Sequence, residues 1–263
     1  MIGLYMITPF HEPQEAEPPW VNRFIFALAE ELPGAPGQIV ALGDQRLAFV
    51  SPGDLFNPEE VRIYQIGTRD DSSQFPVAID TGGDDLWLFR QSLVRDESGL
   101  GIGQSLAYTD GKLYILDSNM ENPTVFIYGL DADNLLQLEG QFETDLAANQ
   151  TGRIVAANSD LVIRSQDELA RFSYQNGNWS RVFYQNLYEE TGNSVSGNLY
   201  LVNDDLVFRF NRGLERRKFN TTGTVLSPFQ SFVFPGNHDI NSYEFNHGQT
   251  IFSTVVGLFM LTH

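Results

Sequence analysis

The chain has 263 residues, of which 34 are acidic and 16 basic, so its formal net charge is −18 at pH 7. This negative charge opposes tight binding to nucleic-acid phosphates and to anionic membranes. The chain has no cysteine, which excludes disulfides, thiolate metal sites and cysteine nucleophiles. Aromatic residues make up 13% of the chain, which also contains 23 glycines and 12 prolines. This composition favours strands and turns.

The N-terminal part predicts one clear strand and one ambiguous element. Residues 3–7 form a short apolar strand, and a loop rich in proline and glutamate follows over residues 9–20. The apolar positions of residues 21–32 fit both a helical face and strand alternation, and we favour a strand. Residues 33–37 contain two prolines and two glycines, which end this element.

The clearest pattern in the chain is a hairpin over residues 105–117. Leu106 and Tyr108 alternate with small or polar neighbours, and Asp110 and Gly111 favour the positive φ angles of a two-residue turn. Further hairpins are predicted over residues 38–50, 153–164, 198–209 and 249–261. Further single strands are predicted over residues 61–66, 85–90, 124–130, 135–142, 169–174, 179–184 and 216–220.

The hairpins recur as a repeat. The large apolar residues that follow the five turns are Leu47, Leu113, Leu161, Leu206 and Leu258. A period of about 45 residues, with a hairpin and one or two further strands in each unit, is typical of propeller blades. This organisation resembles the β-propeller superfamily over essentially the whole chain, although WD40 and kelch motifs are not matched.

The resemblance implies an all-β fold with about five blades. A sixth blade is the alternative if residues 80–101, which include the predicted strand 85–90, form a blade of their own. The expected organisation is a single domain over residues 1–263, with a loop at 9–20 and an insertion at 80–101.

The two ends of the chain match in pattern, over residues 2–8 and 256–262. One explanation is that both are the same type of strand in two different blades. Another is that the N-terminal strand pairs with the C-terminal blade and closes the ring, which removes open sheet edges. A third is that two apolar strands resemble one another by chance.

Several aspartates are candidates for catalytic carboxylates, because five-bladed propellers include glycoside-cleaving enzymes that need two carboxyl groups at defined separations. The candidates are Asp44, Asp80, Asp110, Asp160 and Asp205. All except Asp80 fall at the predicted hairpin turns, where the backbone itself favours aspartate. We therefore predict no catalytic residue.

Metal and cofactor sites are not predicted either. Residues 131–134 place carboxylates at alternate positions but lack the remaining ligands of a calcium loop. The four histidines lack the spacing of a zinc site, and no phosphate-binding or dinucleotide fingerprint occurs.

Five of the sixteen basic residues fall within ten positions: Arg209, Arg212, Arg216, Arg217 and Lys218. One explanation is an internal counter-charge that pairs with carboxylates of the neighbouring blade. The functional alternative is a docking patch for an acidic partner subunit, and we carry the five residues forward as candidates for it.

These observations predict a non-enzymatic structural or interaction module, a subunit of a homo-oligomer or of a larger assembly. The architecture is similar to propeller-containing tail hub and nozzle proteins of short-tailed bacteriophages, which implies a duct that DNA passes without tight binding. The N-terminus lacks the basic region of a signal peptide, so the expected location is the cytoplasm or a virion, with no membrane partner.

The alternative function is a carbohydrate-binding or glycoside-cleaving five-bladed propeller. In that case Trp20, Trp87 and Trp179 are candidates for stacking on sugar rings. Aromatic residues in propellers also fill the space between blades, and the sequence leaves both explanations open.

Overall fold

The protein is described by a computed structural model that places the backbone of residues 39–43, 45–51, 60–68, 78–80, 85–93, 105–118, 120–133, 135–148, 152–157, 159–191, 195–202, 205–210, 213–219, 225–233, 240–246, 249–254 and 257–262. Within these residues the fold is all-β, apart from a short helix, α2 (Leu187–Thr191). In this part of the chain, helical structure is nowhere long and apolar enough to cross a lipid bilayer.

The strands form five sheets, and neighbouring strands are antiparallel. Sheet 1 has the order β1 (Ile39–Gly43), β2 (Arg46–Ser51), β3 (Glu60–Thr68), β5 (Asp85–Leu93), β4 (Ala78–Asp80). Sheet 2 consists of β6 (Ser105–Thr109), β7 (Lys112–Asp117), β8 (Thr124–Leu130) and β9 (Leu136–Glu143). Sheet 3 consists of β10 (Arg153–Ala157), β11 (Asp160–Ser165), β12 (Glu168–Gln175) and β13 (Asn178–Asn186). Sheet 4 consists of β14 (Val195–Val202), β15 (Asp205–Phe210), β16 (Gly213–Phe219) and β17 (Val225–Val233), and sheet 5 of β18 (Ile240–Asn246), β19 (Gln249–Thr254) and β20 (Gly257–Thr262).

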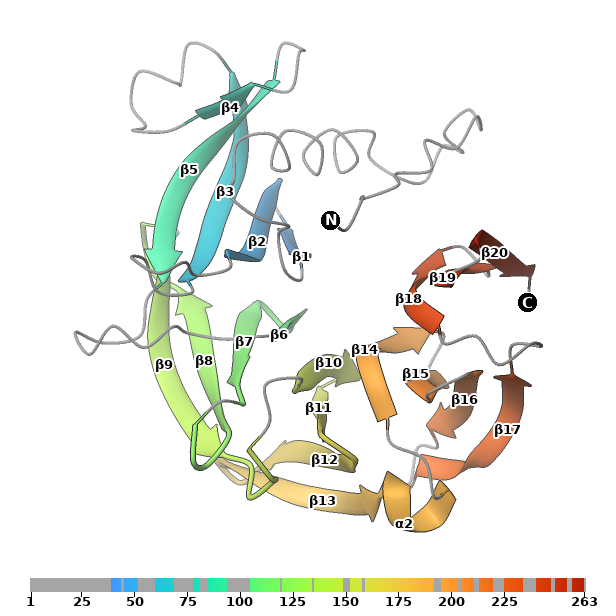
Figure 1. Cartoon of the computed structure of the whole chain (residues 1–263). Helices are drawn as coiled ribbons and strands as arrows, with labels where there is room; N and C mark the ends of the chain where they lie inside the picture. The colour runs from blue at the N-terminus through green and yellow to red at the C-terminus, as the bar shows by residue number, and fades with distance from the viewer. Residues whose placement is uncertain are drawn as a thin grey trace.

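The sheets follow one another along an arc in chain order, with the first strand of each sheet on the inner side and later strands further out (Figure 1). The first strands contact one another in succession: β1 contacts β6, β6 contacts β10, β10 contacts β14, and β14 contacts β18. Each sheet therefore stands beside the next with its inner edge toward a common centre.

The predicted hairpin at residues 105–117 is confirmed as β6 and β7. Thr109 pairs with Lys112 across the turn, and Asp110 and Gly111 have φ angles of 51° and 75°. Both angles are positive, as a two-residue turn compatible with strand twist requires. Four of the five aligned leucines (Leu47, Leu113, Leu161 and Leu206) are the second residue of β2, β7, β11 and β15.

The C-terminal unit differs from its prediction. The hairpin at residues 249–261 is present as β19 and β20, but β18, which was not predicted, precedes it and pairs with β19. Because β18 is the strand that contacts β14, Leu258 lies in the third strand of its sheet, one strand later than the other four leucines. The alignment of Leu258 with them was therefore wrong.

Other differences concern strands late in a unit. The strand predicted within the insertion at 80–101 is β5, which pairs with β3 and belongs to sheet 1. Strand β17 and helix α2 were not predicted. The predicted elements at residues 3–7, 9–20 and 21–32, and with them the N-terminal half of the proposed ring closure, lie outside the described residues.

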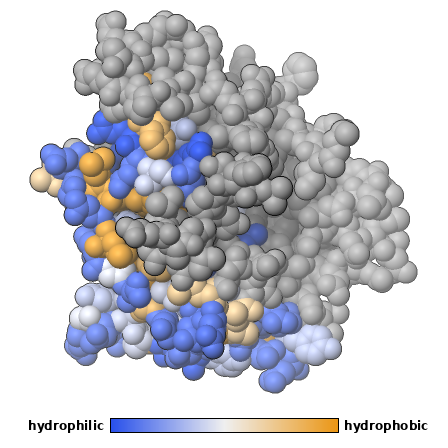
Figure 2. Space-filling view, turned by 60° about the vertical axis from the view of Figure 1, so that its left-hand side comes forward, coloured by the Kyte–Doolittle hydropathy of each residue, from blue (hydrophilic) through white to orange (hydrophobic). Residues whose placement is uncertain are grey.

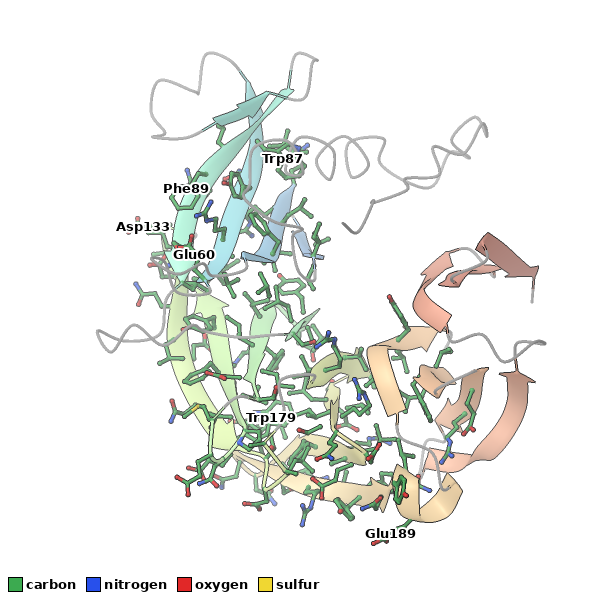
Figure 3. The ribbon with its side chains drawn as sticks, viewed as in Figure 1. Glu60, Trp87, Phe89, Asp133, Trp179 and Glu189 are labelled. Atoms are coloured by element: carbon green, nitrogen blue, oxygen red, sulfur yellow. The ribbon has the colours of Figure 1, made fainter. Side chains whose placement is uncertain are left out.

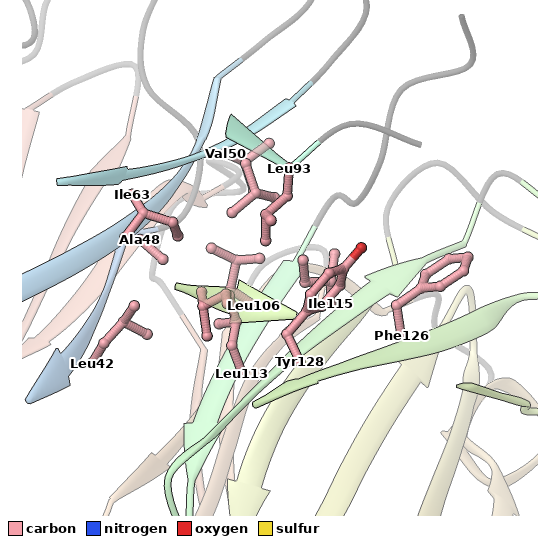
Figure 4. Close-up of a cluster of buried hydrophobic side chains, with 12 residues drawn as sticks. Leu42, Ala48, Val50, Ile63, Leu93, Leu106, Leu113, Ile115, Phe126 and Tyr128 are labelled. Carbon is pink, nitrogen blue, oxygen red and sulfur yellow. The ribbon is translucent and has the colours of Figure 1, made fainter. Parts of the chain in front are cut away.

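Apolar side chains fill the space between sheets 1 and 2, sheets 2 and 3, and sheets 3 and 4. Leu42, Ala48 and Val50 of sheet 1 face Leu106 and Leu113 of sheet 2 in one such layer (Figure 4). A second layer joins sheets 2 and 3, and a third joins sheets 3 and 4. Fully burying a leucine or valine side chain contributes roughly 1.5–3 kcal/mol, so these layers hold neighbouring sheets together.

Polar groups add specific links between the sheets. The side-chain amide of Gln91 in β5 donates to the carbonyl of Leu136 at 2.8 Å and accepts from its N–H at 2.9 Å, which joins the outer strands of sheets 1 and 2. On the inner side, the N–H of Ile154 donates to Oγ of Ser105 at 3.0 Å. These bonds fix the position of one sheet against the next.

Candidate interaction surface

The basic segment predicted as a docking patch is partly inside the protein. Arg217 in β16 has no exposed surface. It donates from Nε to Glu215 at 2.5 Å and from Nη1 to Gln185 of sheet 3 at 3.2 Å, and its guanidinium lies 5.4 Å from the ring centre of Phe208. The prediction that Arg217 is a surface docking residue was therefore wrong. Arg217 is an internal counter-charge at the boundary of sheets 3 and 4.

The other four basic residues remain predicted candidates for a docking patch. Arg209 belongs to β15, Arg216 and Lys218 belong to β16, and Arg212 lies outside the described residues. In the backbone pairing of the two strands, Lys218 is opposite Asp205.

The structure places four of the five candidate carboxylates. Asp110 occupies the turn, as predicted. Asp160 and Asp205 instead begin the strands β11 and β15, so placing them in the turn was wrong. Asp160 forms an ion pair with Arg171 and accepts a hydrogen bond from Ser173 at 2.5 Å. Asp80 ends β4, and Asp44 is outside the described residues.

The loop at residues 131–134 is organised by its first carboxylate. Oδ1 of Asp131 accepts from the N–H groups of Asp133 and Leu135, both at 2.9 Å, and Oδ2 accepts from Gln137 at 2.7 Å. Both carboxylate oxygens thus stabilise the loop itself. The described residues contain no group of three or more histidine, aspartate or glutamate side chains that could hold a metal ion.

The three tryptophans have different positions. Trp87 in β5 is 2% exposed and packs with Phe49 and Tyr64, so it cannot stack on a sugar. Trp20 lies outside the described residues. Trp179 at the start of β13 is half-buried, at the junction of sheets 2 and 3 (Figure 3).

Trp179 is the centre of an aromatic cluster that bridges two sheets. Its ring stacks on Phe142 of β9 at 5.2 Å between centroids, with 15° between the planes. Tyr114 of β7 meets it edge-on at 5.6 Å. Tyr174 of β12, which is 58% exposed, lies at 5.5 Å. The cluster is therefore packed on the side of sheet 2 and open to solvent at Tyr174.

The hairpin turn between β12 and β13 sets this arrangement. Asn176 and Gly177 have φ angles of 53° and 84°, so the turn has the same two-residue geometry as the one in sheet 2. It places Tyr174 and Trp179 directly opposite one another on the same face of the sheet.

Acidic groups surround the cluster. Burial, followed by the charges of Asp110 and Glu139, raises the pKa of Tyr114 to about 12. Glu139 forms an ion pair of 2.8 Å with Lys112, and its side chain crosses directly over Gly129. A Cβ at position 129 would lie 1.9 Å from Oε1 of Glu139, so this ion pair depends on a residue without a side chain.

Further along β13, Tyr184 is a second exposed aromatic residue. It is 44% exposed, and its hydroxyl donates to Oε1 of Glu168 at 2.7 Å. This hydrogen bond is the largest cause that raises the pKa of Tyr184. The guanidinium of Arg181 lies 5.2 Å from the centre of the Tyr184 ring, and Tyr188 of α2 is 53% exposed.

We call the surface formed by these side chains the β13 rim. Its members are Tyr174, Trp179, Arg181, Tyr184 and Tyr188. In the part of the chain that the structure describes, β13 is the last strand of its sheet, and it forms part of the outer side of the arc (Figure 1). Figure 2 shows small hydrophobic patches scattered among hydrophilic residues on the side of the molecule that it brings forward, as is usual for a protein surface.

Of the β13 rim, only Trp179 is a candidate from the sequence, and the other members were not predicted. The signal was present: aromatic residues occur at both the inward and the outward positions of the strand predicted at residues 179–184. A strand covered on one face only alternates more cleanly between apolar and polar residues.

Comparisons with known proteins show the fold alone. The chain matches no family model and no curated protein. In all, 242 chains of solved structures match it, and a fold does not by itself indicate a function. One of them is the crystal structure of a functionally unknown protein from Desulfotomaculum acetoxidans DSM 771, with 16% identity and a TM-score of 0.57. The match covers 88% of this chain and 69% of that one.

Proposed function

We propose that the chain is a β-propeller of about five blades, in which each of the five sheets is one blade. Support comes from the succession of antiparallel sheets along an arc, from the contacts between their first strands and from the apolar layers between them. In such a fold the blades form a rigid frame, and the residues that carry function lie on its surfaces.

The function that we propose for this frame is non-enzymatic protein interaction, as a subunit of a larger assembly. One observation carries the proposal, namely the exposed aromatic residues of the β13 rim. Tyrosine and tryptophan are enriched in protein interfaces and contribute much of their binding energy. The carboxylates of Asp131 and Asp160 are engaged in a loop and in an ion pair, which favours interaction over catalysis by these groups.

The proposal is tested by selecting random peptides on the purified protein. The selected peptides are then titrated against a Tyr174→Ala/Tyr184→Ala double variant. We expect them to bind the double variant at least about tenfold more weakly, because central aromatic residues contribute about 2 kcal/mol or more to an interface. The matched control is Leu138→Ala, which removes a 53% exposed side chain from β9 and should leave the affinity unchanged. Equal affinity for the wild type and the double variant would contradict the proposal.

Carbohydrate binding is the second candidate, and the exposed Tyr174 beside Trp179 favours it. Aromatic faces of this kind can stack on sugar rings. A specific hit on a glycan array that is lost in Tyr174→Ala would reverse the order of the two candidates. Homo-oligomerisation and a place in a phage tail remain predictions from the sequence.

A further inference from the structure

Among the described residues, carboxylates outnumber basic groups around the β13 rim. The basic groups are Arg181 on the rim itself and Lys112, which forms an ion pair of 2.8 Å with Glu139. Asp110 and Glu139 act on Tyr114 at the end of the rim near Trp179, and Glu168 and Glu189 act on Tyr184 at the other end. Figure 3 places Trp179 and Glu189 at opposite ends of β13. Two clusters of aromatic rings thus each have two carboxylates beside them.

Aromatic rings bordered by carboxylates suit a cationic group. A cation over an aromatic face is attracted by the ring quadrupole, and a nearby carboxylate adds a direct charge interaction. The protein already shows this preference within itself, since Arg181 lies over the ring of Tyr184. The formal net charge of −18 further attracts positively charged partners and opposes the approach of a second copy of the chain.

The spacing of the two aromatic clusters defines the geometry of the ligand. On β12, the residue opposite Trp179 is Tyr174 and the residue opposite Tyr184 is Ala170, so Trp179 and Tyr184 are separated by four residue steps of β12. On β13 they are five residues apart, and a bulge accommodates the extra residue. Four steps of a strand span about 13 Å. An extended segment that lies along β13 covers the same distance between residues i and i+4.

We propose that the β13 rim binds an extended basic segment of a partner protein, with lysine or arginine at positions i and i+4 over the Tyr174–Trp179 pair and over Tyr184. This inference rests on the proposed interaction function and specifies the chemistry of the partner. Arg181 has a defined part in it: its positive charge competes with the incoming cation for the ring of Tyr184.

The test uses three labelled peptides in a neutral background, titrated against the full chain by fluorescence anisotropy. The first has two lysines at i and i+4, the second has the same composition with adjacent lysines, and the third has glutamates at i and i+4. We expect the first peptide to bind most tightly, and its affinity to fall with added salt because exposed charges are screened. Equal binding of the glutamate peptide would overturn the proposal.

Variants of the rim give effects of opposite sign. Tyr174→Ala should weaken binding of the first peptide by about threefold to tenfold, as expected for the loss of one cation–aromatic contact. Arg181→Ala, at an exposed position, should instead tighten it, because the competing cation is removed. A weaker affinity of Arg181→Ala for the lysine peptide would refute the inference, because it would show that Arg181 does not compete with the bound cation.

Failure of this inference is distinguishable from failure of the proposed function. If selected peptides depend on Tyr174 and Tyr184 but lack basic residues, the interaction function stands and the basic partner is refuted. If binding depends on a glycan or on self-association of the chain, measured by light scattering after size-exclusion chromatography, the basic partner is refuted as well.

Discussion

Replacement of Gln91 by alanine should break the link between the outer strands of sheets 1 and 2. The amide of Gln91 makes two hydrogen bonds to the backbone of Leu136, one as donor and one as acceptor. Leu136 is buried, so its N–H and carbonyl do not regain full hydration when the amide is removed. A buried polar group left without its partner costs about 1–3 kcal/mol, and we therefore expect Gln91→Ala to lower the free energy of unfolding by about 2–4 kcal/mol.

A second substitution at this position separates the two bonds. Gln91→Glu keeps an oxygen that can accept from the N–H of Leu136, but an ionised carboxylate cannot donate to the carbonyl. Near pH 4 the carboxyl group of a glutamate takes up a proton and becomes a donor. The stability difference between Gln91→Glu and the wild type should therefore be smaller near pH 4 than near pH 7.

Urea denaturation followed by tryptophan fluorescence gives the measurement. A change in midpoint with an unchanged slope reports a change in stability. The matched control is Gln137→Ala, which removes an amide that is bonded to Asp131 on the surface and should cost less than about 1 kcal/mol. If Gln91→Ala is no less stable than Gln137→Ala, the reasoning is refuted.

Two further predictions concern packing and ionisation. A Cβ on Gly152 would lie 2.4 Å from Oγ of the buried Ser118, so Gly152→Ala should cost about 1–3 kcal/mol and lower Tm by about 2–4 °C per kcal/mol. Gly140→Ala, where a Cβ has open space, should leave Tm nearly unchanged, and equal Tm values for the two variants would contradict this. Because the pKa of Tyr114 is raised from 10.0 to about 12, the unfolded chain loses this proton first, so stability falls as pH rises through that interval. Tyr114→Phe should show a smaller loss of stability there, measured by denaturation near pH 9 and pH 11.5, and an equal loss in both proteins would count against the burial of the Tyr114 hydroxyl.

Local features of the sequence predicted much of the fold. Asp110 and Gly111 identify the turn of sheet 2 because the required φ angles restrict the residues that fit there. The aligned leucines Leu113, Leu161 and Leu206 recur because the second strand of their sheets contributes to the layers between sheets. Leu47 packs instead in a cluster within sheet 1. Turn geometry and the position of an apolar residue within a strand depend on residues close together in the sequence, so a local sequence pattern is enough to predict them.

The surface and the links between sheets were not predictable in the same way. Gln91 and Leu136 are 45 positions apart, and nothing in either neighbourhood indicates the other. Arg217 belongs to a run of basic residues, which suggested a surface patch until its contacts with Glu215 and Gln185 were known. Pairing across sheets depends on the tertiary arrangement, and a single sequence carries little trace of it.

The order of the strands within the sheets bears on how the protein is made. In sheets 2, 3 and 4 every strand pairs with the strand next to it in the sequence, so each pairing closes only a short loop. Low sequence separation of contacts favours fast folding, and chains fold from the N-terminus as they are synthesised. Each of these sheets can therefore complete its hydrogen bonds soon after its own last strand leaves the ribosome, with the preceding sheet already in place to cover its apolar face.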